Sequence, residues 1–116
     1  MSNSKVIQSA PIGIFDSGVG GLTVLKEILE LLPFENFVYF GDVGRTPYGG
    51  RSKEIITQFT KQDIAFLKEQ NVKFIICACN SASSTALPEI KSNYDIEIVG
   101  VIEDRKSTRL NSSHRL

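Results

Sequence analysis

The stretch KFIICACNSASS, residues Lys73–Ser84, decides the fold. Its first part holds a short apolar run, FII, that is β-branched or aromatic, with polar residues on both sides. Such a run is typical of a buried strand rather than of a helix segment. Side chains alternate along a strand, so Ile75, Cys77 and Cys79 are expected on one face, with Cys79 at the last position of the strand.

The second part of this stretch predicts a helix over Ser81–Ser92, with Asn80 or Ser81 as its N-cap. Pro88 is expected to kink this helix or to begin a new turn. The free amides of the first turn would then lie beside the Cys79 sulfur and make that thiol more reactive. Cys77 is interpreted as a small core residue. The C-x-C spacing fits neither a C-x-x-C redox pair nor a zinc site. From this stretch alone, plain buried packing of Cys79 stays open as the alternative to a reactive role.

Length and composition limit the classes of protein to which the chain can belong. A chain of 116 residues forms one domain at most, and its 41% hydrophobic content is ordinary for a globular protein. The sequence holds no apolar stretch long enough to span a membrane and no basic-then-apolar leader. Two cysteines so close along one strand do not pair easily, which favours a reducing cytoplasm.

The charge is uneven along the chain. The net charge is zero, but Asp104–Leu116 holds four basic residues and one acidic residue, so Met1–Glu103 keeps 9 basic and 12 acidic residues and a net charge of −3. This balance argues against a nucleic-acid partner for the body of the chain. The only histidine, His114, lies in the tail. Acid–base chemistry in the body is therefore left to Cys, Asp, Glu, Lys or Tyr, with no histidine metal ligand.

Three more strands are expected, over Ile12–Phe15, Phe37–Phe40 and Glu97–Ile102. Helices are expected between them, one ending at Pro33 and one capped by Ser52. The alternation predicts an α/β fold with a parallel sheet of about four strands, flavodoxin-like, with flanking helices. The strand-to-helix loops of such a sheet meet at its carboxyl edge, where a small anionic or zwitterionic molecule would bind. The buried side of the second helix is expected to carry Ile55, Ile56, Phe59, Phe66 and Leu67.

Three motifs carry a resemblance to a known family. DSGVGG at 16–21, GDVGRTPYG at 41–49 and ACNSAS at 78–83 resemble, in order and spacing, the amino-terminal half of bacterial glutamate racemase. The resemblance implies one lobe of a two-lobe protein, with the substrate between the lobes and one catalytic cysteine from each. It also implies no pyridoxal or metal cofactor, interconversion of L- and D-glutamate for peptidoglycan in the cytoplasm, and a homodimer of the whole protein.

By motif, Cys79 would be the acid/base of this lobe. The first motif would contact the substrate ammonium or tune the cysteine, the second would shape the pocket, and the third would hold a carboxylate. The substrate-binding candidates implied in this way are Asp16, Ser17, Pro47, Tyr48, Gly49, Asn80 and Ser81.

Two features depart from the family pattern. Val43-Gly44 stands where the family more often has Thr-Ala. After Glu103, where the family continues with Pro-Gly, the chain reads DRKSTRLNSSHRL, which resembles a translated sequencing-library adapter. We therefore expect a flexible N-terminus at 1–10, a truncated lobe at 11–103 and a non-native disordered tail at 104–116.

A lobe that carries one of the two catalytic cysteines is expected to be inactive alone. Three alternatives stay open: a racemase for aspartate or another amino acid, a non-catalytic module that binds a small anion, and a genuine basic tail for nucleic acid or membrane.

Overall fold

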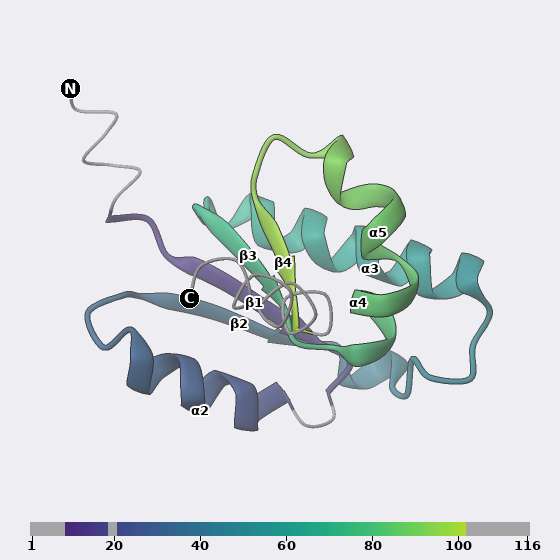
Figure 1. Ribbon diagram of the computed structural model, residues 1–116, viewed down its shortest axis with the longest axis horizontal. Helices are drawn as coiled ribbons and strands as arrows, with labels where there is room; N and C mark the ends of the chain where they lie inside the picture. Colours follow the sequence, from purple (N-terminus) through teal and green to yellow (C-terminus); the bar gives the residue numbers. More distant parts are fainter. Residues whose placement is uncertain (1–8, 19–20, 102–116) are drawn as a thin grey trace, which may run out of the picture.

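The computed structural model describes residues 9–18 and 21–101. In them, four strands form an all-parallel sheet in the order β2-β1-β3-β4 (Figure 1). The expected α/β architecture is confirmed, and each strand run found in the sequence corresponds to one strand of the sheet. The strands are β1 Ile12–Asp16, β2 Phe37–Gly41, β3 Phe74–Cys77 and β4 Ile98–Gly100.

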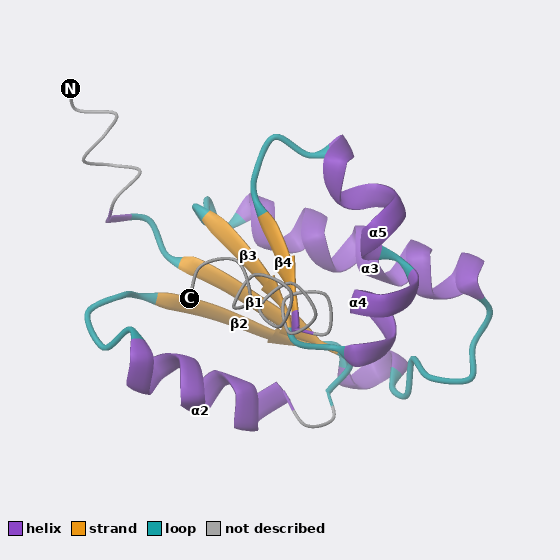
Figure 2. Ribbon diagram, in the orientation of Figure 1, coloured by secondary structure: helices purple, strands orange, loops and turns teal. Residues whose placement is uncertain are grey.

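Helices cover both faces of this sheet. Helix α2, Gly21–Leu31, lies on one face, and α3, Lys53–Glu69, lies on the other with the short helices α4, Asn80–Thr85, and α5, Leu87–Ile90 (Figure 2). Strand β1 lies between β2 and β3, so it is buried at all five positions. Single turns of 3-10 helix complete the list, η1 at Val43–Arg45 and η2 at Lys91–Asn93.

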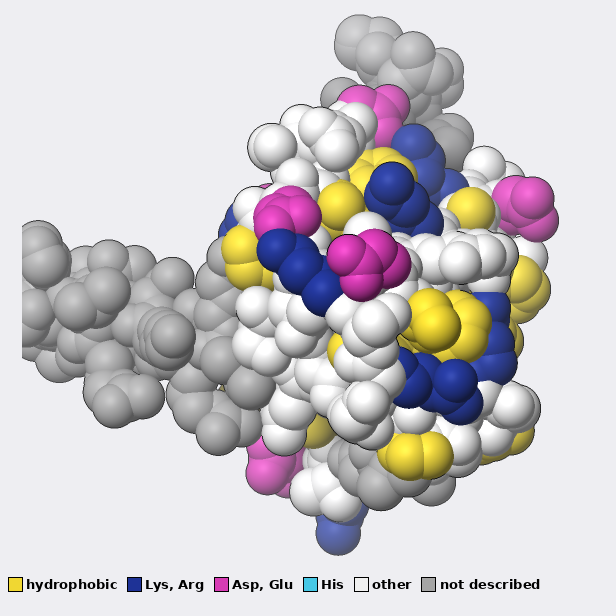
Figure 3. Space-filling view, turned by 90° about the vertical axis from the view of Figure 1, so that its right-hand side faces the viewer, with side chains coloured by type: hydrophobic (Ala, Val, Ile, Leu, Met, Phe, Trp, Pro, Cys, Tyr) yellow, Lys and Arg dark blue, Asp and Glu magenta, His cyan; other side chains and the backbone are white. Residues whose placement is uncertain are grey.

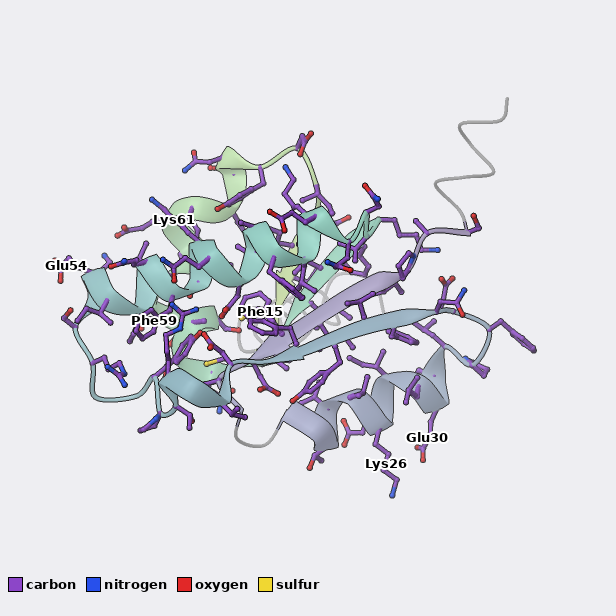
Figure 4. The ribbon with its side chains drawn as sticks, turned by 180° about the vertical axis from the view of Figure 1, so that it is seen from behind. Phe15, Lys26, Glu30, Glu54, Phe59 and Lys61 are labelled. Carbon is purple, nitrogen blue, oxygen red and sulfur yellow. The ribbon has the colours of Figure 1, made fainter. Side chains whose placement is uncertain are left out.

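Helix α3 begins where the sequence predicts. The Ser52 side chain accepts a hydrogen bond from the Ile55 amide at 3.2 Å, which satisfies one of the free donors of the first turn. Figure 4 shows Phe15 pointing from β1 toward this helix, while Lys26 and Glu30 on α2 point away from the sheet. The buried stripe of α3 repeats every three or four residues and consists of Ile56, Thr60, Asp63, Ile64 and Leu67.

One local prediction is wrong and another is confirmed. Strand β3 ends at Cys77, which pairs with Phe15 and with the last residue of β4, Gly100. The chain leaves the sheet there, so Cys79 follows the strand instead of ending it. As expected at Pro88, the helical segment over 81–92 is divided into α4, α5 and η2, with Pro88 in the first turn of α5. Proline lacks an amide hydrogen and is tolerated in a first turn, so it begins a new helix instead of extending α4.

Two hydrophobic side chains are strongly exposed at the end of α2. Leu31 and Phe34, at and just beyond the end of α2, are 77% and 98% exposed. No helix in residues 9–18 and 21–101 has the length and apolar character needed to cross a membrane. Most of the N-terminal segment 1–10 and all of the tail 104–116 lie outside the described residues, so the predictions for those segments stay predictions.

Candidate active site

The loops that follow β1, β2 and β3 meet at the carboxyl edge of the sheet, as expected for parallel strands. They enclose an open pocket of about 460 Å³. Seven of the eight candidate residues line it together: Ser17, Pro47, Tyr48, Gly49, Cys79, Asn80 and Ser81.

Cys79 is the N-cap of α4, a position that the sequence assigns to Asn80 or Ser81. Its Sγ accepts a hydrogen bond from the Ala82 amide at 3.5 Å, and its carbonyl accepts one from the Ser83 amide at 2.9 Å. The sulfur therefore takes the place of the usual cap oxygen. Cys79 is 5% exposed and borders the pocket, so its thiol can face a small bound molecule.

Cys77 has a different environment. It is fully buried in β3, and burial raises the pKa of its thiol to about 12. Ser83 donates a hydrogen bond to the Cys77 carbonyl at 3.2 Å, which ties α4 to the strand. Cys77 is thus a neutral core residue, in agreement with the sequence interpretation.

Asp16 is the candidate that does not line the pocket. Its side chain is fully buried; one carboxylate oxygen accepts the Tyr39 hydroxyl at 2.7 Å and the other accepts the Gly18 amide. Burial, with Asp16 as the second cause, raises the pKa of Tyr39 to about 12, so Tyr39 keeps the proton that it donates. Contact of this carboxylate with a substrate ammonium group stays a prediction. An effect on the cysteine through the first loop stays a prediction.

Tyr48 joins the pocket to a buried polar cluster. Its ring is 1% exposed, and its hydroxyl oxygen lies 2.5 Å from Oδ2 of both Asp42 and Asp63. Arg45 binds Asp42 through Nε at 2.9 Å and Nη2 at 2.7 Å. The peptide bond between Thr46 and Pro47 is cis. The second motif thus forms one wall of the pocket, and the hydrogen bonds of Tyr48 and Arg45 hold that wall in place.

Several residues of the site were missed from the sequence. Thr23, Val24 and Glu27 of α2 also line the pocket, and their helical spacing after a glycine-rich loop was the available signal. Asp63 was missed because a charged residue on a helix is expected in solvent. Among the described residues, no group of three or more His, Cys, Asp or Glu side chains could hold a metal ion.

Comparison with known proteins gives sequence relatives over most of this chain. No protein-family model matches the chain. It is 52% identical over 94 residues to glutamate racemase of Thermus thermophilus, which covers 81% of this chain and 37% of that protein. It is 53% identical over 97 residues to glutamate racemase 2 of Caldanaerobacter subterraneus, covering 84% of this chain and 36% of that protein.

A solved structure agrees in fold. Glutamate racemase from Francisella tularensis, in complex with D-glutamate, matches with a TM-score of 0.79 at 40% identity, over 90% of this chain and 40% of that one. The chain therefore spans a little over a third of the length of the relatives that it matches. Over the matched part of its length, in sequence and in fold, the chain is homologous to the glutamate racemases.

Proposed function

We propose that this chain supplies one wall of the active site of a glutamate racemase, an isomerase that interconverts L- and D-glutamate with thiols and without pyridoxal or a metal. The observation that carries the proposal is the position of Cys79, whose sulfur borders the pocket beside Ser17, Asn80 and Ser81. The names of its relatives support the reaction class, and the D-glutamate complex of one relative supports the substrate.

The chemistry fits these residue types. Removing the α-proton of an amino acid leaves a carbanion beside a carboxylate, which needs a positioned base and oriented donors. Cys79 would exchange the α-proton, and the side chains of Asn80 and Ser81 would hold the carboxylate. Asp16 and Ser17 would contact the ammonium group or tune the cysteine. Pro47, Tyr48 and Gly49 would shape the pocket.

Inversion at Cα needs a base on one face and an acid on the other, since a single thiol returns the proton to the face that it left. In the proposed mechanism, the second thiol belongs to a second lobe. Losing one acid–base partner typically costs a factor of about 10²–10⁴ in rate. In the cell, the product would supply D-glutamate for peptidoglycan in the cytoplasm, with the whole protein a homodimer that needs neither nucleic acid nor membrane.

The test has two arms. The 116-residue chain, incubated with L-glutamate, should leave its circular dichroism unchanged against a buffer control, and a loss of signal that Cys79→Ser abolishes would overturn the need for a second thiol. A two-lobe protein that contains this lobe should racemise L-glutamate in preference to L-aspartate, and Cys79→Ser should remove that activity. A preference for aspartate, or full activity in Cys79→Ser, would refute the proposal.

A further inference from the structure

The buried cluster behind the pocket wall contains more acceptor oxygens than protons. Asp63 is fully buried on α3, and Asp42 is 7% exposed just before η1. Both place Oδ2 2.5 Å from the hydroxyl oxygen of Tyr48. A phenol has one hydrogen to donate, so it can make only one of these two hydrogen bonds as the donor. The other bond requires a proton on a carboxyl group.

The surroundings decide which carboxyl group holds that proton. Asp42 receives two contacts from the Arg45 guanidinium, at 2.9 and 2.7 Å, so its negative charge is compensated. Asp63 lies farther from the same guanidinium, with 3.4 Å between its Oδ1 and Nη2 of Arg45. One cation beside two ionised carboxylates would leave an uncompensated buried charge, which is costly. The added proton therefore belongs to Asp63, which donates to Tyr48, while Tyr48 donates to Asp42.

This chain of bonds ends at the pocket. Tyr48 stands between Pro47 and Gly49, and all three line the pocket wall opposite Ser81, whose Oγ lies 3.4 Å from where a Cβ on Gly49 would be. Arg45 also stacks over the Phe59 ring at 4.2 Å, which keeps its guanidinium in place. Figure 3 shows this side of the molecule, where basic side chains lie beside hydrophobic ones.

We propose that Asp63 is a positioning residue that carries a proton and, through Tyr48, fixes the wall of the pocket formed by Pro47 and Gly49. Loss of that proton leaves Tyr48 with two ionised carboxylates and a single hydrogen, so one contact becomes repulsive and the wall loosens. The inference rests on the proposed function only in taking this pocket as the substrate site.

The titration behaviour of the cluster agrees with this geometry. Burial, the largest cause, and Asp42 raise the pKa of Asp63 to about 7, although the Tyr48 hydrogen bond and Arg45 act in the opposite direction. Burial also acts upward on the pKa of Asp42, but hydrogen bonds from Arg45 and Tyr48 outweigh it and hold that pKa below its ordinary value. From β3, Cys77 also faces Asp63 and has a pKa of about 12. Among these groups, Asp63 is the one that titrates near neutrality.

The test is a carbon-13 NMR titration of the aspartate carboxyl groups of this 116-residue chain from about pH 5 to 9, across the Asp63 midpoint at about 7. One carboxyl signal should titrate near pH 7 and disappear in Asp63→Asn, and the Gly49 amide should shift with the same midpoint. Because asparagine still donates to Tyr48, Asp63→Asn should make the Gly49 signal independent of pH. Asp63→Ala should displace that signal at every pH.

Asp95→Asn is the matched control, because Asp95 is an exposed carboxylate that pairs with Lys68 at 3.0 Å. It should leave the midpoint near 7 unchanged. An Asp63 signal that titrates below pH 5, or a Gly49 amide that does not follow it, would overturn the inference. If a variant fails to fold, the titration of the unmodified chain still tests the inference. The proposed function is tested separately by adding L-glutamate and following the Ser81 amide signal, since the titration needs no ligand.

Discussion

Substitution of Gly18 should test how the first two loops are held together at the pocket. Gly18 has a φ of +97°, a conformation that side chains rarely adopt, and a Cβ added there would lie 2.6 Å from Cγ1 and 2.9 Å from Cα of Val43. Val43 begins η1, which precedes the pocket wall. Gly18→Ala therefore combines backbone strain with a clash against backbone that cannot rotate away.

The chain supplies two matched controls for this change. Gly50 also has a positive φ, +89°, but an added Cβ would meet nothing within 4 Å, so Gly50→Ala measures strain alone. Gly44 has neither a positive φ nor a neighbour within 4 Å, so Gly44→Ala should be close to neutral. Strain should cost about 1–2 kcal/mol in Gly50→Ala. Overpacking adds about 1–3 kcal/mol, so Gly18→Ala should lose about 2–5 kcal/mol.

The assay is urea unfolding of the three variants and the parent chain, with the free energy of unfolding compared at a common slope. The expected order of loss is Gly18→Ala, then Gly50→Ala, then Gly44→Ala. A second measurement, the amide spectrum, should show a shift at Val43 in Gly18→Ala that is absent in Gly50→Ala. If Gly18→Ala costs no more than Gly50→Ala, the contact between the two loops does not hold them, and the account of the pocket rim is wrong.

Three further predictions concern the two cysteines, the three tyrosines and the N-cap of α3. Brief iodoacetamide treatment near neutral pH should label Cys79, which borders the pocket, before Cys77, whose pKa is raised to about 12; equal labelling in a peptide map would contradict the site geometry. Burial raises the pKa of all three tyrosines, Tyr39 to about 12, so the folded chain should show no tyrosinate absorbance at the ordinary tyrosine pKa of about 10. Because these folded-state values lie above the unfolded one, their stabilising effect is present below about pH 10 and is lost as the pH rises toward 12, so ionisation in the absorbance titration should accompany unfolding. Ser52→Ala should lower the free energy of unfolding by about 1 kcal/mol through loss of the α3 cap, whereas Ser52→Thr should keep most of it, and equal losses in both would show that the cap contact does not matter.

The sheet was predictable because its signals are local. Each strand is a short β-branched or aromatic run, and the helical patterns between them require right-handed crossovers and parallel strands. The end of β3 was not predictable from its own residues, because it is set by Gly100, the last residue of β4, across the ladder. The cap of α4 was missed for a related reason. Oxygen side chains are the usual caps, so the sequence favoured Asn80 or Ser81 over the sulfur of Cys79.

The pocket residues were predictable as motifs, but their supports were not. Ile55 and Phe66 were expected on the buried side of α3, yet they are 39% and 40% exposed. The helix instead turns Thr60 and Asp63 inward. That rotation is favourable because Tyr48 and Arg45, from the loop that precedes the helix, reach Asp63. The hydrophobic periodicity of a helix carries no information about polar partners on other elements.

The central place of β1 also governs the order of events during synthesis. Ile12 pairs on one side with Phe37 and on the other with Phe74, so the second partner emerges about 60 residues later, a delay of roughly 3–12 s at ordinary elongation rates. No hairpin in this sheet can form early, since every strand pair is parallel. On the ribosome, the nascent chain would therefore hold β1, α2 and β2 as a half-sheet in which the inner edge of β1 stays unpaired until β3 arrives.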